Sequence, residues 1–445
     1  MRTTILSAVG LLGAAVLTGA SATAVGETCR GEAATHVGTP QATITGTEGR
    51  DVVVTAGAYS VDTRGGDDLV CVTDGVETFV STWAGADVVD ASAAGPTSLS
   101  VVLGAGNDTF EGAAKTLTVL AGNVGGGGLE VDDGVDVVRV GLLPDARTRV
   151  ESGQPGLPNG DVIRLAGGGD VRWDGPMAAG AELVGGVGAN RLQASLPGGD
   201  VEVDLAAGTA SGAGAGGAQD LHWSGFESYV FRGGYPDAVT ELHVAGSRED
   251  DLVDVQVWPM TLDSPDPRIT ASLGRGDDVL NTSPVGAPGS SYDGGAGRDR
   301  LGVAAWGTVA LDLATGILSA TANGVTSRAS VSSFQDAHVW GRTVRILGSR
   351  ESNVLTASGC RGSRVSGGRG ADRIQFTIDT PHTGGTCIRI PQARFGGGRG
   401  NDRIVGGPGD DRLIGGLGED RVEGGLGRDA CQGEQRSTCE SKLRG

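Results

Sequence analysis

A run of four consecutive nine-residue units near the C-terminus constrains this fold most. Residues 397–432 read GGRGNDRIV, GGPGDDRLI, GGLGEDRVE and GGLGRDACQ, with glycine at positions one, two and four and aspartate at position six. Glycine permits the left-handed, closely approached backbone of a tight loop, and the last three residues favour a short strand. The eighth residue of each unit would point inward. This predicts a thin apolar core that contains Phe395, Ile404, Leu413, Val422 and Cys431.

These units resemble the repeats-in-toxin, or haemolysin-type, calcium-binding family, whose nonapeptide builds a parallel β-roll. The resemblance implies that two units form one coil and that each Ca²⁺ lies between loops on the same side. Asp402 and Asp420 would then share one ion, and Asp411 and Asp429 another. It also implies further ligands from the backbone carbonyls of Gly397, Gly400, Gly406, Gly409, Gly415 and Gly418.

Calcium suits loops of this kind because it accepts six to eight oxygen ligands with loose angular demands. The alternative interpretation is that each aspartate only stabilises its turn through bonds to the backbone. For a single unit we would prefer that alternative. Four units in register favour Ca²⁺ as the cofactor, judged by the signature of the family.

Weaker copies of the unit occur upstream. GGAGRDRLG from Gly294 and GGRGADRIQ from Gly367 keep all three glycines and the aspartate, so Asp299 and Asp372 are weaker candidate ligands. Each lacks an adjacent perfect unit, and without a partner loop its coordination shell would be incomplete. Shorter remnants, such as GRGDDVL from Gly274, are compatible with a calcium site or with a plain turn.

In the N-terminal part an aspartate before an apolar pair recurs at Asp51, Asp68, Asp87 and Asp108, with spacings of 17, 19 and 21 residues. One such step per coil predicts a degenerate solenoid. Because the spacing between the aspartates varies, we expect these coils to have a structural role with little metal binding. Two longer units, from Val201 and from Val309, resemble the inserts between repeat blocks of this family. The second has Asn353 where aspartate is expected, which weakens a cation site.

The predicted fold is all-β: a right-handed parallel β-solenoid that ends in a calcium β-roll. With 81 glycines and 4% aromatic residues, the chain has little material for a large conventional core. We expect a signal peptide at 1–24 and degenerate repeats at 25–200. We expect repeats with longer inserts at 201–358 and the calcium roll with its tail at 359–445.

The first residues have the pattern of a Sec signal peptide, with Arg2, an apolar run and small residues before position 24. A transmembrane helix is the alternative, but the run is short and contains Gly10 and Gly13. We therefore expect a secreted protein without a membrane span after cleavage.

Six cysteines in an exported chain suggest disulfides, although six allow 15 connectivities. Pairing within neighbouring coils favours Cys29 with Cys71, Cys360 with Cys387, and Cys431 with Cys439. The last bond would fold the tail over the open end of the roll, with a free buried thiol as the alternative. Zinc binding is disfavoured because no CxxC spacing occurs and the five histidines are scattered.

The formal net charge of −19 argues against nucleic acid as a partner. No HExxH, GxSxG or P-loop motif is present, and we expect a non-catalytic protein. A β-helix enzyme acting on polyuronates, as a lyase or epimerase, is the alternative. Arginines beside the aspartates, such as Arg403, Arg412 and Arg421, are expected to pair with surface carboxylates. Cell-wall or extracellular glycans stay open as partners.

Overall fold

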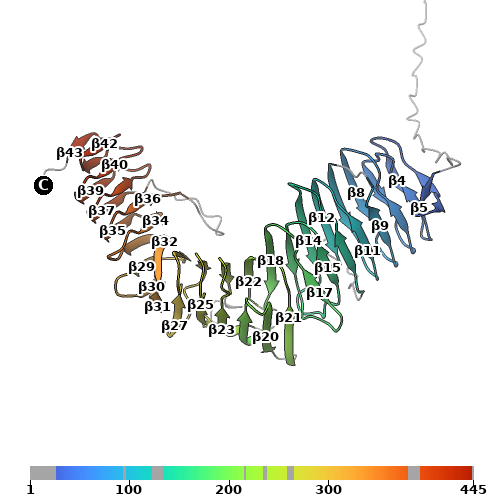
Figure 1. The fold of residues 1–445 in the computed structure, drawn as a ribbon, viewed down its shortest axis with the longest axis horizontal. Helices are drawn as coiled ribbons and strands as arrows, with labels where there is room; N and C mark the ends of the chain where they lie inside the picture. Colours follow the sequence, from blue (N-terminus) through green and yellow to red (C-terminus); the bar gives the residue numbers. More distant parts are fainter. Residues whose placement is uncertain are drawn as a thin grey trace, which may run out of the picture.

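The computed structural model describes residues 27–93, 97–122, 134–214, 217–233, 238–257, 265–378 and 391–442. The expected signal peptide at 1–24 and Cys387 lie outside the described residues. Every regular element within them is a β-strand, and the strands wind into one stack of coils (Figure 1). The all-β solenoid is therefore confirmed.

One sheet of parallel strands, which we call the long sheet, runs from one end of the described chain to the other. Its strands are β4 (Thr43–Thr45), β6 (Ser60–Asp62), β8 (Glu77–Ser81), β10 (Ser98–Val102), β12 (Thr116–Ala121), β14 (Arg147–Ser152), β16 (Gly169–Trp173), β18 (Asn190–Ser195), β22 (Ser228–Arg232), β24 (Leu252–Gln256), β26 (Val279–Thr282), β28 (Asp299–Ala304), β32 (Phe334–Gly341), β34 (Val354–Gly359), β36 (Arg373–Phe376), β38 (Arg403–Val405), β40 (Arg421–Glu423) and β42 (Gln435–Ser437). Each pairs in parallel with the next.

Two sheets cover the opposite side of the coils. The N-terminal sheet has eight strands, β3 (His36–Val37), β5 (Val52–Val54), β7 (Leu69–Cys71), β9 (Val88–Ala91), β11 (Thr109–Gly112), β13 (Val137–Val140), β15 (Val162–Leu165) and β17 (Glu182–Val184). The C-terminal sheet has fifteen: β21 (Gly217–His222), β20 (Thr209–Gly214), β19 (Gly199–Asp204), β23 (Val239–Ala245), β25 (Arg268–Ser272), β27 (Ser290–Asp293), β31 (Val325–Ser332), β30 (Ile317–Ala322), β29 (Thr308–Asp312), β33 (Thr343–Leu347), β35 (Ser363–Arg369), β37 (Ala393–Arg399), β39 (Arg412–Leu417), β41 (Ala430–Gln432) and β43 (Ser441–Lys442).

The two longer units, from Val201 and from Val309, form antiparallel extensions of the C-terminal sheet. β19 pairs with β20 and β20 with β21 in the first, and β29 pairs with β30 and β30 with β31 in the second. The extra length therefore stays hydrogen-bonded within the sheet, which satisfies its backbone groups.

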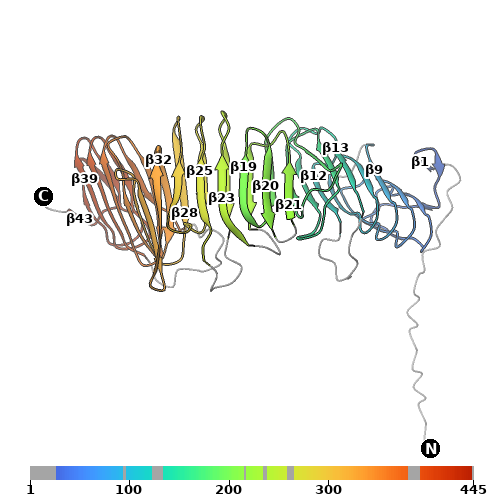
Figure 2. The same cartoon turned by 90° about the horizontal axis from the view of Figure 1, so that it is seen from below.

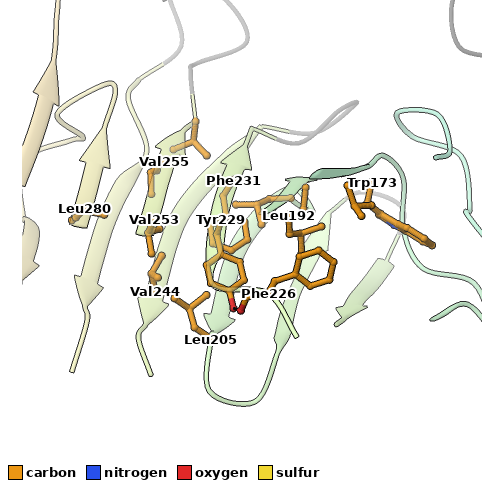
Figure 3. Packing of buried hydrophobic residues seen from close by; sticks show 14 of the residues in the cluster. Trp173, Leu192, Leu205, Phe226, Tyr229, Phe231, Val244, Val253, Val255 and Leu280 are labelled. Atoms are coloured by element: carbon orange, nitrogen blue, oxygen red, sulfur yellow. Dashed lines mark hydrogen bonds between the residues drawn. The ribbon is translucent and has the colours of Figure 1, made fainter. Parts of the chain in front are cut away.

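The main core is a column of inward side chains that continues from coil to coil. A small second cluster, of Cys29, Val52, Val54 and Leu69, lies near the N-terminal hairpin. Parallel register places Phe395 beside Leu413 and Leu413 beside Cys431, while Ile404 lies beside Val422. All five are buried, as predicted from position eight of the repeat. Near the middle of the chain the column contains aromatic rings, and Tyr229 stacks on Phe231 with ring centroids 5.7 Å apart (Figure 3).

The stack is elongated and bends near its middle, and the long sheet faces the inside of the bend (Figure 1). Viewed from below, the coils follow one another in a nearly straight row (Figure 2). The C-terminal sheet consequently presents its outer face on the outside of the bend. Among the described residues no helix is long and apolar enough to cross a membrane.

Both ends of the stack carry a disulfide. At the N-terminal end the hairpin β1 (Thr28–Cys29) and β2 (Glu32–Ala33) is joined to the coils by Cys29–Cys71. At the C-terminal end Cys431–Cys439 joins the last repeat to the tail. Both pairings are those expected. Cys360 is also disulfide-bonded, and its expected partner is the cysteine outside the described residues.

Candidate metal centre

The aspartate-containing turns of the C-terminal coils stack on two opposite edges of the solenoid. Turns 367–372, 397–402 and 415–420 lead from the C-terminal sheet into the long sheet. Turns 406–411 and 424–429 lead back. Because two units complete one coil, alternate units lie on the same edge, and Arg403 therefore pairs with Arg421 while Leu413 pairs with Cys431.

Glycine at position four of the unit is required by the stacking itself. Gly400 has φ of +122°, and a Cβ added to it would lie 1.9 Å from the carbonyl oxygen of Gly370 in the preceding coil. Gly418 repeats this arrangement, with a Cβ position 2.1 Å from the oxygen of Gly400. Any side chain at position four would separate the coils and open the turns.

A ladder of hydrogen bonds joins each aspartate to the next coil. The backbone N–H of Asp402 donates to Oδ1 of Asp420 at 2.9 Å, and that of Asp411 donates to Oδ1 of Asp429 at 2.8 Å. The structure thus brings together the two pairs expected to share an ion. In the tail, Glu434 and Glu440 take the place of aspartate, accepting from Asp420 N–H at 2.8 Å and Asp429 N–H at 2.6 Å.

The second oxygen of these carboxylates has a different environment. Oδ2 of Asp372, Asp402, Asp420 and Asp429 is buried and accepts no hydrogen bond. A carbonyl oxygen of the next coil lies close by: a Cβ built on Gly397 would lie 2.1 Å from Oδ2 of Asp402 and 2.5 Å from the carbonyl oxygen of Gly415. A buried acceptor among acceptors is unfavourable, so each turn calls for a proton or a cation.

The first glycines of the other repeats have the same setting. A Cβ on Gly406 would lie 2.5 Å from Oδ2 of Asp411 and 2.1 Å from the Gly424 oxygen. Here Oδ2 also accepts the N–H of Gly407 at 2.6 Å. The position-four glycine Gly409 lies against Gly427 of the next coil, so all six glycines expected as ligands lie in these turns.

Burial raises the pKa of the repeat aspartates. Desolvation is the main cause, and it raises the pKa of Asp402 and of Asp411 to about 6. It also raises the pKa of Asp372, Asp420 and Asp429. A charged carboxylate in these turns is therefore disfavoured until a positive charge compensates it.

Asn190 shows how a turn of this shape is satisfied without a charge. Residues 185–193 read GGVGANRLQ, which is the repeat with asparagine at position six, a unit missing from the sequence-based expectations. Nδ2 of Asn190 donates to the carbonyl oxygens of Gly186 at 2.7 Å and Gly188 at 3.0 Å. The amide N–H groups of Asn190 therefore satisfy the carbonyl oxygens of its own turn without a cation. Likewise, Nδ2 of Asn353 donates to the Gln335 oxygen at 2.5 Å.

Asp372 and Asp299 are not isolated, contrary to the expectation that they lack a partner loop. Asp372 N–H donates to Oδ1 of Asp402 at 2.8 Å, although the two lie 30 residues apart. Asp278 N–H donates to Oδ1 of Asp299 at 2.9 Å. The expectation was wrong because strand pairing sets the stacking, and extra residues between β36 and β37 leave the coil register intact.

A related ladder runs through the N-terminal half, between the long sheet and the N-terminal sheet. It joins Asp51, Asp68, Asp87, Asp108, Asp136 and Asp161 by bonds from each backbone N–H to the next Oδ1. The last two were missed because insertions lengthen the spacing. The motif of aspartate before an alternating apolar run, in DVVRV and DVIRL, would have identified them. Burial raises the pKa of Asp87 to about 7.

Within the described residues no three His, Cys, Asp or Glu side chains gather to hold a metal ion. A cation in these turns would depend on backbone carbonyl oxygens for much of its coordination shell. A mixed set of carboxylate and carbonyl oxygens in stacked loops fits Ca²⁺, which tolerates irregular oxygen shells, better than Mg²⁺ or Zn²⁺.

Comparison with protein families gives one match, confined to the stacked turns. Residues 396–430 match the family described as RTX calcium-binding nonapeptide repeat, in four copies. No curated protein matches the chain. The matched residues are those whose turns and buried carboxylates lie on both edges of the C-terminal coils.

Proposed function

We propose, from the premise that residues 396–430 are RTX calcium-binding nonapeptide repeats, that this chain is an exported, non-catalytic solenoid whose C-terminal coils are completed by extracellular Ca²⁺. RTX nonapeptide repeats bind Ca²⁺, so calcium is the cofactor. In the proposal, Asp402 with Asp420 and Asp411 with Asp429 hold two principal ions.

The observation that carries the proposal is the buried Oδ2 row. In this row, Asp372 N–H donates to Oδ1 of Asp402, and Asp402 N–H donates to Oδ1 of Asp420. The Oδ2 atoms of all three aspartates have no donor. A divalent ion beside Oδ2 would neutralise the carboxylates and attract the carbonyl oxygens of adjacent coils. Ion binding and the stacking of the coils are therefore coupled.

The two candidate ligands outside the four-repeat block also have stacked neighbours. Asp372 stacks on Asp402, and Asp299 stacks next to Asp278, so each has a neighbour that could share an ion. At Asn353 the amide donates to the Gln335 carbonyl and replaces the charge, which ends the proposed cation row on this side.

In this proposal, calcium binds only after export, because the calcium concentration is sufficient only outside the cell. Calcium sites of extracellular modules bind at about 0.1 to 1 mM, a range that leaves them empty at cytosolic calcium. The end disulfides Cys29–Cys71 and Cys431–Cys439 suit an oxidising compartment. The C-terminal coils would then be loose during export and ordered outside the cell.

Calcium titration of the mature chain, starting at residue 25, tests the proposal. We expect millimolar Ca²⁺ to raise the β-sheet signal in circular dichroism, and isothermal titration to give at least two ions per chain. Asp420→Asn should lose one of these ions while keeping its Oδ1 acceptor for the Asp402 N–H. Asp254→Asn, on the outward face of β24, is a control of equal charge and should retain every ion.

Unchanged β-sheet content and no bound calcium at millimolar concentration would overturn the calcium role. A separate assay tests the proposal that the chain is not an enzyme. Release of unsaturated uronate ends, or epimerisation, when the purified chain is incubated with polyuronates would instead support the alternative of a β-helix enzyme.

A further inference from the structure

Four exposed arginines lie in one row across the outer face of the C-terminal sheet. Arg345 on β33 is directly opposite Arg364 on β35, which is opposite Arg394 on β37, which is opposite Arg412 on β39. We call these four residues the sheet row. Neighbouring strands are about 4.8 Å apart, so the row brings positive charges together at that spacing.

Like charges directly opposite each other across strands are destabilising unless something compensates them. None of the ion pairs in the described residues includes an arginine of the sheet row. The expected pairing of Arg403, Arg412 and Arg421 with surface carboxylates is likewise not found there. The row therefore leaves its guanidinium groups open to solvent, in a chain of net charge −19.

A second row runs parallel to the first, along the adjacent turns. Arg350, Arg369 and Arg399 are exposed and occupy position three of successive turns, and Arg369 pairs in register with Arg399. We call them the turn row. They line an open groove of about 570 Å³, together with Ser349, Ser366 and Asp312. The two rows thus border one continuous strip of the C-terminal sheet and its edge.

We propose that this strip binds a linear carboxylated polysaccharide, a polyuronate, lying along the solenoid axis across the strands. Planar guanidinium groups bind carboxylates in a bidentate manner, which gives geometric specificity as well as attraction. The strand spacing of about 4.8 Å is close to the length of one sugar ring in an extended chain. Successive uronate carboxylates can therefore meet successive arginines.

Nucleic acid fits the strip less well. Single-stranded nucleic acids bind where aromatic side chains alternate with basic ones, so that bases can stack. The outward neighbours of the sheet row are Thr343, Leu347, Ser366, Gly396 and Ile414, none of which is aromatic. The strip offers charge and hydrogen bonds without a stacking platform.

This inference rests on the proposed function, because two of the three turn-row arginines lie on turns proposed to hold calcium. Arg369 and Arg399 precede Asp372 and Asp402 by three residues. Calcium held by those carboxylates would remove negative charge beneath the strip, so polyuronate should bind better to the calcium-loaded protein.

The test compares two triple variants of the mature chain. R364Q/R394Q/R412Q removes most of the sheet row. R373Q/R403Q/R421Q removes an equal charge from three exposed arginines stacked in register on the long sheet, on the other side of the same coils. Fluorescence anisotropy measures binding of a labelled, short oligogalacturonate that does not gel, in the presence of calcium. Its methyl ester and an oligonucleotide of equal charge are the comparison ligands.

We expect the oligogalacturonate to bind the wild type and its methyl ester not to bind. The sheet-row variant should lose about tenfold or more in affinity, the effect of removing a few charge-assisted contacts. The long-sheet variant should lose less than about threefold. Both variants should keep the calcium stoichiometry and β-sheet content of the wild type.

Three results would overturn the inference: no binding by a wild type that takes up calcium normally, an equal loss in both variants, or oligonucleotide binding as tight as oligogalacturonate binding. A wild type that takes up no calcium would contradict the proposed function instead. Because calcium uptake is measured separately from ligand binding, the two failures are distinguishable.

Discussion

At the scale of single residues, the two oxygens of each repeat aspartate have separate roles. Oδ1 accepts a backbone N–H from the preceding coil, as Asp420 does from Asp402. Oδ2 of Asp402, Asp420 and Asp429 stays buried without a donor, whereas Oδ2 of Asp411 accepts the N–H of Gly407 in its own turn. The first role can be filled by an amide as well as by a carboxylate. Only the role of Oδ2 as a cation ligand requires a negative charge. The buried Oδ2 is therefore the atom that indicates a cation site.

Asn190 allows the reverse experiment. In Asn190→Asp the Nδ2 bonds to Gly186 and Gly188 are lost, and a carboxylate faces two carbonyl oxygens. Without calcium we expect a loss of roughly 1–3 kcal/mol in the free energy of unfolding, the range for an unsatisfied buried polar group. Urea unfolding in EGTA measures this loss. Asn190→Ala, which removes the amide without adding charge, separates the two effects.

Recovery of stability in the Asn190→Asp variant on adding calcium would show that the turn needs only a carboxylate to become a cation site. Equal stability of the aspartate and asparagine forms in EGTA would show that the amide bonds of Asn190 do not stabilise the turn.

The buried Asp87 predicts a pH dependence of the N-terminal half. Its folded-state pKa is raised to about 7 from 3.8, mainly by desolvation. The folded state therefore binds the proton more tightly than the unfolded state. The resulting stabilisation is complete below pH 3.8 and is lost as the pH rises through about 7.

In EGTA, the wild type should thus lose more stability between pH 5 and pH 8 than Asp87→Asn, whose side chain does not ionise. The difference should be roughly 1–3 kcal/mol after allowance for solvent screening. Urea unfolding at both pH values, followed by circular dichroism, measures it. Parallel pH profiles of the two proteins would show that Asp87 is not the titrating group.

At the scale of elements, the tail acts as one more coil. β42 pairs with β40 and β43 with β41, while Glu434 and Glu440 continue the two carboxylate ladders. The last repeat is therefore covered by strands that lack its sequence pattern. This arrangement protects the edge of the final coil from pairing with other chains.

Removal of the Cys431–Cys439 disulfide should weaken this end of the stack. The bond closes a short loop, with a sequence separation of 8, for which chain-entropy arguments give about 2–3 kcal/mol. In Cys431→Ala/Cys439→Ala we expect faster amide hydrogen exchange in β39 to β42 and unchanged exchange in the N-terminal coils. Exchange detected by mass spectrometry measures this. Uniform destabilisation along the chain would contradict a local cap.

At the scale of the whole molecule, the coils differ in length but share a register. Spacings between ladder aspartates run from 17 residues, between Asp51 and Asp68, to 30, between Asp372 and Asp402. The strands on both sides of a longer segment keep their parallel register, so the aspartates still stack. The bend of the solenoid leaves the sheet row on its outer side, where an extended polymer has access (Figure 1).

The sequence by itself determined the solenoid and the inward core positions. These follow from local rules: glycine where coils touch, aspartate at a fixed place and an apolar residue behind it. The pairing of Asp402 with Asp420 and of Asp411 with Asp429 was implied by the resemblance of the repeats to the RTX family. Only the tertiary structure decided which distant turns become neighbours, as Asp372 and Asp402 do, and which arginines form rows. Such contacts depend on how strands pair across loops of variable length, and no local spacing records that.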